Sequence, residues 1–473
     1  MNHCIDSKTK ARYFDLVIRN ADVYTGLDHF FGDIAISNGK IVKLAKNLGA
    51  AKKDINANGS LVLPGGIDSH CHIDQPTGDS SRMADDFSSG TRSALCGGTT
   101  TIIPFALQEK GDSLIHTVTN YHVKATGHAF CDYGFHIIIT DIRNGETLQE
   151  ITRLAKIGYT SFKIYMTYES LKMSDYDILE ILSVISQVNG VAMIHAENDE
   201  CIRWLTDQLI KSKKTVARFH AVSRPEIVEA EAVYRAITLG EISGSTVLIV
   251  HVSSRQAFEN ISNAKMRGCN VYAETCPQYL FLTKDDLERH GEIISGRYIC
   301  SPPPRDKENQ KYVWENLING NVDIFSSDHA PFNDDCCGKR IPESKQGFHK
   351  IPNGLPGLET RLALLLSEVL TRKNISINDF VKITALNQAK LFGLYPKKGV
   401  ISVGSDADIV IWKKRKVIIR NKNLHHAVNY TPYEKMEVQV WPEVVFLRGN
   451  IVFKYPNFVP DIPEGEFLKR NSR

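Results

Sequence analysis

The sequence predicts an α/β protein in which a (β/α)8 barrel carries a smaller β-sandwich domain built from both ends of the chain. Two patterns lead to this prediction. The middle of the chain alternates buried apolar runs with helical patterns, which is typical of a parallel sheet. Both ends carry short alternating apolar runs separated by turn residues, which is typical of antiparallel strands. The 473 residues also suffice for a substantial core.

The two ends of the chain show the same strand pattern. Candidate strands occupy residues 15–19, 33–37 and 40–44 near one end, and 407–412, 417–420, 438–441 and 443–447 near the other. Because a long middle block separates them, we expect one sandwich to which both ends contribute. The predicted segments are 1–63 and 399–454 for the sandwich, 64–398 for the barrel and 455–473 for a C-terminal tail.

The middle block contains eight candidate strands. They lie near residues 66–69, 99–104, 134–139, 160–165, 191–194, 246–250, 270–273 and 322–326. Helical patterns separate them, for example over residues 224–240, a stretch rich in Glu and Ala that ends on Gly. In a barrel of this kind the chemistry takes place at the C-terminal ends of the strands. Reactive side chains are therefore expected there.

Composition favours a small-molecule substrate. The chain has 57 Lys and Arg against 54 Asp and Glu, a net charge of +3, which gives no basic face for nucleic acid or an anionic membrane. No apolar run approaches the ~20 residues of a spanning helix, and residues 1–14 lack the apolar core of a signal peptide. The ten scattered cysteines are read as reduced thiols, the adjacent Cys336 and Cys337 among them as incidental or structural. We therefore expect a cytoplasmic protein.

Four histidines fall at the expected strand ends. His70 and His72 follow the first strand, and strand alternation points both to the same side. His195 and His251 close the fifth and sixth strands. Any one of them alone is more often a satisfied core histidine. Four around one barrel mouth instead predict a shared partner, and neutral imidazole is a natural zinc ligand.

Asp328 and Lys163 complete the candidate set. Asp328 follows the eighth strand, where it could be a helix cap or turn residue. Beside four histidines it is better explained as a metal ligand that also accepts a proton. Lys163 lies toward the end of the fourth strand. Its cation would repel a metal, so spacing alone favours a surface or ion-paired lysine.

Several motifs resemble those of the amidohydrolase superfamily, and within it those of dihydropyrimidinases and D-hydantoinases, the former most closely. They are PGGIDSHCH at 64–72, FKIYMTY at 162–168, IHAE at 194–197, VHV at 250–252, SDHAP at 327–331 and GVISVGSDAD at 399–408. The resemblance extends over nearly the whole chain. It implies zinc-dependent hydrolysis of the cyclic amide of 5,6-dihydropyrimidines, such as dihydrouracil to N-carbamoyl-β-alanine, and of hydantoins.

The resemblance also implies residue roles. Lys163 would be carboxylated on its amine (N6-carboxylysine) and, together with a hydroxide, would bridge two Zn²⁺ ions per chain. His70, His72, Lys163 and Asp328 would hold one ion, and Lys163, His195 and His251 the other. Asp328 would move the proton and Tyr168 would stabilise the oxyanion. Tyr168, Ser301 and Asn353 would bind the substrate, the last two through backbone atoms, although a packed aromatic and a rigid turn remain alternatives for Tyr168 and Ser301.

Other members of the superfamily stay open as alternatives. A D-hydantoinase or an allantoinase would act on a different cyclic ureide, and a protein like the collapsin response mediators would share the fold without catalysis. All six candidate ligands are present here, which argues against the non-catalytic reading. Dihydroorotase is disfavoured because its His-x-His pair is closely followed by an arginine, whereas HIDQP follows here at 72–76.

Apolar residues in the otherwise polar tail predict an interface. Phe458, Val459, Ile462 and Phe467 would form an exposed stripe if the tail lay in water. The resemblance implies a homotetramer, so we expect the tail to contact a neighbouring subunit. A disordered tail is the alternative.

Overall fold

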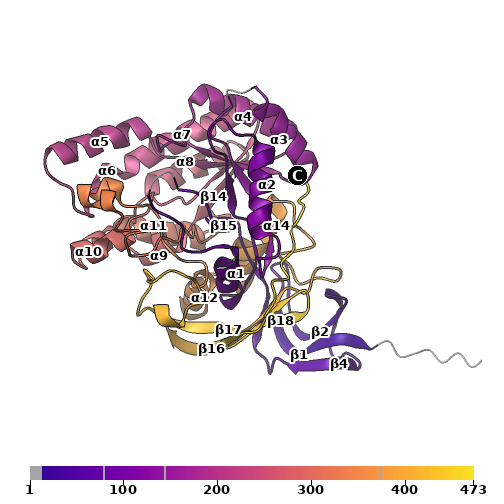
Figure 1. Cartoon of the computed structure of the whole chain (residues 1–473). Coiled ribbons are helices and arrows are strands. Elements are labelled where there is room, and N and C mark those ends of the chain that lie inside the picture. Colours follow the sequence, from indigo (N-terminus) through magenta and orange to yellow (C-terminus); the bar gives the residue numbers. More distant parts are fainter. Residues whose placement is uncertain (1–12, 78–79, 143–144, 373, 473) are drawn as a thin grey trace, which may run out of the picture.

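A computed structural model describes residues 13–77, 80–142, 145–372 and 374–472. Residues 1–12 of the predicted first sandwich segment and residue 473 of the tail therefore lie outside the described residues. Figure 1 shows two parts, a large α/β body and a β layer that contains both the first and the last strands. Within the described residues, no helix is both long and apolar enough to cross a membrane.

The α/β body is built on parallel strands at all eight predicted positions. They are β6 (Gly66–Asp68), β7 (Thr99–Ile102) with β8 (Phe105–Leu107), β9 (Asp132–Tyr133) with β10 (His136–Ile138), β11 (Ser161–Tyr165), β12 (Val191–His195), β13 (Thr246–Ile249), β14 (Val271–Thr275) and β15 (Ile324–Phe325). The second predicted strand is split around Pro104, which has no amide hydrogen. The third barrel strand begins before its predicted range, as β9, and resumes after Gly134 and Phe135 as β10.

The pairing order of these strands follows the chain around the barrel. One sheet runs β6-β7-β9 and the other β15-β14-β13-β12-β11-β10-β8. A parallel bridge between Cys71 and His329 brings the segments after the first and last strands together. This strand order and the separate terminal sheet confirm the predicted barrel with its terminal β domain.

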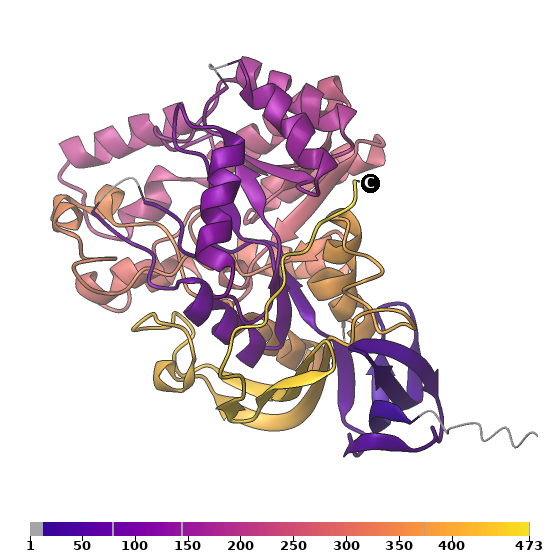
Figure 2. The same cartoon turned by 45° about the vertical axis from the view of Figure 1, so that its right-hand side comes forward.

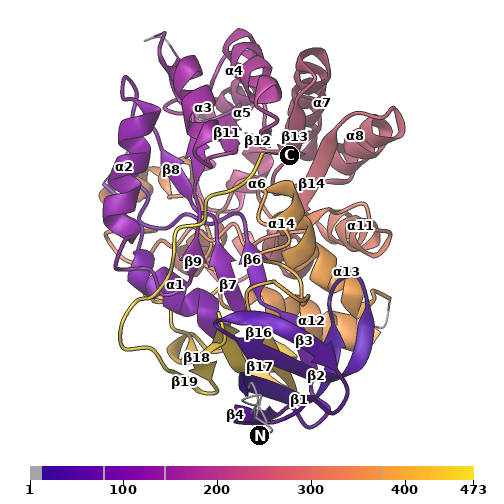
Figure 3. The ribbon, with the colours of Figure 1, turned by 90° about the vertical axis from the view of Figure 1, so that its right-hand side faces the viewer.

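Helices surround the strands (Figure 3). They are α1 (Phe87–Cys96), α2 (Leu114–Ala125), α3 (Thr147–Lys156), α4 (Asp175–Gln187), α5 (Asp199–Lys211), α6 (Phe219–Ser223), α7 (Glu226–Ser243), α8 (Arg255–Met266), α9 (Pro277–Phe281), α10 (Glu292–Ser295), α11 (Lys307–Ile318), α12 (Arg361–Arg372), α13 (Ile377–Val381) and α14 (Asn387–Leu391). The helix expected over 224–240 is α7. Gly240 is buried inside it, and Gly244 ends it with a left-handed φ of 66°.

The β layer joins both ends of the chain in one sheet. Its strands are β1 (Phe14–Tyr24), β2 (His29–Ser37), β3 (Lys40–Ala45), β4 (Ala51–Asn56), β5 (Leu61–Pro64), β16 (Ile409–Ile418), β17 (Glu437–Leu447), β18 (Asn450–Lys454) and β19 (Asn457–Phe458). Only residues 417–418 of the predicted strand at 417–420 are in a strand, as the end of β16. Antiparallel pairing of β5 with β16 makes the junction between the two ends. The predicted domain boundaries remain predictions.

The C-terminal segment departs in part from the expected exposed stripe. After β19 it runs along the α/β body (Figure 2). Phe467 packs against Tyr159 with ring centroids 5.3 Å apart, and Leu468 is buried, both within the same chain. Val459 and Ile462 stay 46% and 71% exposed. The apolar spacing alone could not show that Phe467 would find its partner in the barrel of its own chain. The predicted contact of the tail with a neighbouring subunit remains a prediction.

Candidate active site

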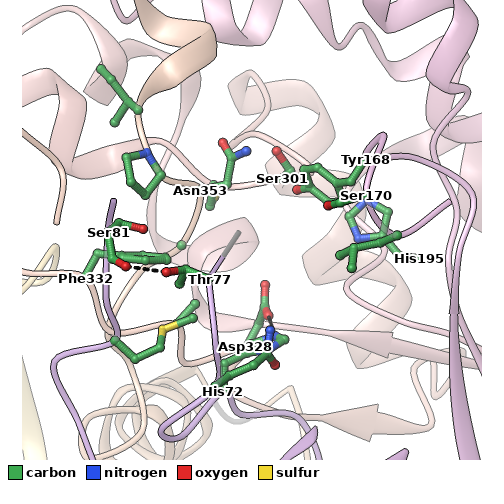
Figure 4. Close-up of a pocket in the computed structure, with 18 of the residues that line it drawn as sticks. His72, Thr77, Ser81, Tyr168, Ser170, His195, Ser301, Asp328, Phe332 and Asn353 are labelled. Carbon is green, nitrogen blue, oxygen red and sulfur yellow. Dashed lines mark hydrogen bonds and ion pairs between the residues drawn. The ribbon is translucent and has the colours of Figure 1, made fainter. Parts of the chain in front are cut away.

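A cavity of about 430 Å³ opens at the C-terminal ends of the barrel strands. Its lining includes five of the six predicted metal ligands and all three predicted substrate-binding residues, namely His70, His72, His195, His251, Asp328, Tyr168, Ser301 and Asn353. The sixth ligand, Lys163, lies beneath the cavity and is fully buried. Figure 4 shows His72 and Asp328 on one side of the cavity, with Tyr168, Ser301 and Asn353 across from them.

His70, His72 and Asp328 form a compact cluster. One ligand atom from each lies within 4.8 Å of the others, as a metal ion would require. The Nε2 atoms of His70 and His72 are 3.2 and 3.4 Å from the same Asp328 oxygen, Oδ1. Cys71, between the two histidines, joins the apolar core instead. His70 and His72 thus face the cavity and Cys71 faces the core, as expected from strand alternation.

His195 and His251 extend this cluster, and Lys163 lies below it. The rings of His195 and His251 have centroids 4.5 Å apart, and those of His70 and His251 5.4 Å. Lys163 Nζ lies over the rings of Phe105 and Tyr165, at 5.0 and 5.2 Å. In the described part of the chain neither Lys163 Nζ nor His251 Nδ1 has a hydrogen-bond partner. Buried polar atoms without a partner are rare in native proteins and need an explanation.

Burial and neighbouring charges set the protonation of these groups. Burial lowers the pKa of Lys163 to about 8, against the opposing effect of Glu274. Burial also holds the pKa values of His195 and His251 well below the usual value, which keeps both imidazoles neutral. Although burial acts to raise it, the pKa of Asp328 is well below its usual value because His70 is close. Neutral imidazoles and an ionised carboxylate are the forms that bind metals.

A second layer of polar groups fixes the histidine rings. His70 Nδ1 is 2.7 Å from Glu274 Oε1, and His72 Nδ1 is 2.8 Å from Gln75 Oε1. His195 Nε2 is 2.8 Å from Glu197 Oε2. Partners of this kind set which ring nitrogen faces the cavity.

Sequence reasoning assigned no role to these partners. Glu197 stood in a quoted motif, and Glu274 is a charged residue at the end of a buried strand, which could have marked it. Gln278, whose Nε2 lies 3.4 Å from Asp328 Oδ2, gave no such signal.

The predicted substrate-binding residues lie across the cavity from the histidine pair. The Tyr168 ring meets the His195 ring edge to face, with centroids 5.3 Å apart. Burial raises the pKa of Tyr168 to about 12, so its hydroxyl is a neutral donor. Ser301 is buried, and Asn353 Oδ1 is a buried atom with no partner among the described residues.

Three of the site residues have an unusual backbone. Tyr168, His251 and Asp328 have φ values of 72°, 41° and 48°, in the left-handed region that residues other than glycine rarely adopt. Such a conformation costs about 1–3 kcal/mol and persists where the surroundings enforce it, often at functional sites. The residues that point into the cavity are thus held there against local preference.

The donor set fits a metal centre. Three ligand atoms of His70, His72 and Asp328 already converge, two neutral imidazoles stand beside them, and one buried amine lacks a partner. A bound cation would give the converging atoms a common partner and offset the repulsion between closely placed acceptors.

Comparison with known proteins identifies the family. The chain matches the amidohydrolase family over residues 61–452, and it belongs to that family. A D-hydantoinase of Geobacillus stearothermophilus is 40% identical, with 96% of each chain covered. The solved structure of a dihydropyrimidinase from Brevibacillus agri is 38% identical with a TM-score of 0.93, covering 96% of this chain and 98% of that one. An L-hydantoinase (dihydropyrimidinase) from Arthrobacter aurescens is 28% identical with a TM-score of 0.86, covering 97% and 100%.

Proposed function

We propose that this amidohydrolase opens the ring amide of cyclic ureides, namely 5,6-dihydropyrimidines such as dihydrouracil, which yields N-carbamoyl-β-alanine, and hydantoins. The observation that carries the proposal is the convergence of His70, His72, His195, His251 and Asp328 above a buried lysine at the barrel mouth. Relatives named hydantoinase and dihydropyrimidinase support both substrate groups.

Two zinc ions are the cofactors that we propose. His70, His72 and Asp328 would hold one, His195 and His251 the other, and carboxylated Lys163 would serve both. A pKa of about 8 leaves part of the Lys163 amine neutral near pH 7, and a neutral amine can combine with CO₂ to give a carbamate anion. When bound, such ions polarise a carbonyl and supply a nucleophile at neutral pH.

The residues of the chain then do three things. Backbone groups at Ser301 and Asn353 hold the ureide ring in the cavity. The Tyr168 hydroxyl, kept neutral by burial, donates a hydrogen bond to the oxygen that becomes negative during attack. Asp328, kept ionised by His70, accepts a proton and delivers it to the departing ring nitrogen.

The decisive test is turnover of dihydrouracil, dihydrothymine, hydantoin and allantoin by one zinc-loaded preparation. We expect hydrolysis of the first three. Turnover of allantoin alone would assign an allantoinase, and absence of turnover with full metal content would favour a non-catalytic relative.

We further propose a homotetramer in which the tail contacts a neighbouring subunit. The side chains of Val459 and Ile462 support this, because they are apolar and stay exposed on their own chain. Ile462→Asp should shift the protein to a smaller species by light scattering at low concentration. A wild-type protein that is monomeric at micromolar concentration would contradict the tetramer.

A further inference from the structure

A buried ion pair lies behind the wall of the cavity. Glu197 follows β12, and Arg224 lies between α6 and α7. They are 0% and 7% exposed, and Arg224 Nη1 donates to Glu197 Oε2 at 2.6 Å. Removing two charges from water is costly, and a buried pair is by itself weak evidence for stability.

The pair connects two residues that line the cavity. The oxygen of Glu197 that binds Arg224 also lies 2.8 Å from His195 Nε2. Arg224 Cζ lies 5.4 Å from the centroid of the Tyr168 ring, within the range of a cation–π contact. His195 and Tyr168 meet edge to face, and Figure 4 shows them side by side. The four side chains thus close a circuit of contacts.

Each contact in the circuit restrains a group that the reaction needs. Glu197 engages Nε2 of His195 and so leaves Nδ1 of that ring for the cavity. Tyr168 has a left-handed backbone, and the two residues after it, Glu169 and Ser170, are exposed. The loop that carries Tyr168 therefore packs little against the ring, and the neighbouring side chains set the orientation of the ring.

Arg224 is itself fixed at both ends. Its guanidinium is held by Glu197, and its carbonyl oxygen accepts a hydrogen bond from Arg305. A planar guanidinium can pair with a carboxylate and face a ring at the same time, whereas the lysine ammonium is a point charge on a flexible stem. The geometry therefore depends on arginine at this position.

We propose that Arg224 is a positioning residue that holds the Tyr168 hydroxyl and the His195 imidazole in register with each other, through its contact with the phenol ring and its ion pair with Glu197. This inference rests on the proposed function, in which Tyr168 stabilises the oxyanion and His195 holds a zinc ion.

A double-mutant cycle tests the link to Tyr168. Arg224→Lys keeps the charge and should lower kcat on the order of 10- to 100-fold with little change in KM, because small misplacements carry losses of this size. In a Tyr168→Phe background the same substitution should lower kcat by much less, since its effect passes through the hydroxyl that is already gone. A full loss in both backgrounds would overturn the link.

Metal release tests the link to His195 without measuring activity. Arg224→Lys and Glu197→Gln should each speed the loss of one zinc equivalent to a colorimetric chelator, consistent with the 10- to 100-fold affinity losses of comparable outer partners. An unchanged rate of zinc release in both variants would overturn the proposed link to His195. The double variant Glu197→Gln/Arg224→Met removes both charges, so it remains available if a lone buried charge prevents folding, and it should show the same faster release.

Lys398→Arg is the matched control. Lys398 is 2% exposed and pairs with Asp132 and Asp408 at 2.6 and 2.7 Å, so it is another buried ion pair, but it does not line the cavity. Its effect on kcat should be the same with and without Tyr168→Phe, and its zinc release should match wild type. If the wild type hydrolyses none of the four ureides, the proposed function fails, and metal release still decides the Glu197–Arg224 arm. If it is active and the cycle is additive, only the positioning of Tyr168 fails.

Discussion

The candidate metal ligands form two groups that differ in how many of their polar atoms have a partner. We call His70, His72 and Asp328 the first half of the site, and Lys163, His195 and His251 the second half. In the first half, His70 and His72 both approach Asp328 Oδ1, and their other ring nitrogens contact Glu274 and Gln75. In the second half, the rings of His195 and His251 contact each other, and His195 Nε2 contacts Glu197. There, in the described part of the chain, Lys163 Nζ and His251 Nδ1 have no partner.

The difference indicates what each half requires. The first half is joined even without an ion, because the Asp328 carboxylate lies within 3.4 Å of both imidazoles. The second half contains two neutral imidazoles and an amine but no carboxylate between them, so nothing in it joins its ligand atoms to one another. Carboxylation of Lys163 and binding of a metal ion would therefore change the contacts of the second half more than those of the first.

Lys163→Ala should have the largest effect. It removes the group that we expect to become the anion of the second half, so turnover should fall to background and at least one zinc equivalent should be lost. Elemental analysis and turnover of one preparation measure both. Lys163→Arg is the control that keeps a cation but cannot form the carbamate, and it should fail equally. Near-normal turnover in either variant would return Lys163 to the role of a structural lysine.

Asp328→Asn should have the next largest effect, because it removes the carboxylate that lies between the two histidines of the first half. Loss of a general acid–base group typically lowers kcat by about 10²–10⁴-fold. The zinc of the second half should remain bound, so this variant should keep at least one zinc equivalent. Loss of both zinc equivalents would show that the two halves bind metal as one unit.

Tyr168→Phe should lower kcat by about 10²–10³-fold, the usual cost of removing one oxyanion donor. Tyr168 contacts the second half through the edge of its ring, which phenylalanine keeps. Zinc content should therefore stay at the wild-type value. Turnover within a few-fold of wild type would show that the ring only packs.

The smallest effect concerns metal-free protein. Lys163 has a folded pKa near 8, below its ordinary 10.5, so between these values the unfolded chain binds more protons and stability rises with pH. Lys163→Met removes the unpaired amine and should raise the free energy of unfolding by about 1–3 kcal/mol at pH 7. The gain should shrink as the pH rises from about 8 to about 10.5, as denaturant unfolding in chelator would show. A destabilised variant would mean that the amine is satisfied in metal-free protein.

Sequence pattern located the barrel strands and the histidines at their ends, because burial and alternation leave direct traces in the chain. The role of Lys163 came only from resemblance, since a lone lysine in an apolar strand carries no sign of its chemistry. Arg224 and Gln278 were missed because their partners are distant in sequence: Glu197 lies 27 residues before Arg224, and Asp328 lies 50 residues after Gln278. The left-handed backbone conformations of His251 and Asp328 could not be predicted either, because neither residue type requires such a conformation.

The C-terminal segment has a consequence for how the protein is made. Leu468 and Arg470 are buried against the α/β body, and Arg470 donates to Ser161 Oγ in β11 and to the carbonyl oxygen of Phe135. These residues are synthesised after every barrel strand. During synthesis, Ser161 of β11 and the carbonyl oxygen of Phe135 lack this partner until Arg470 has been made. These contacts can therefore form only after all the barrel strands have been made.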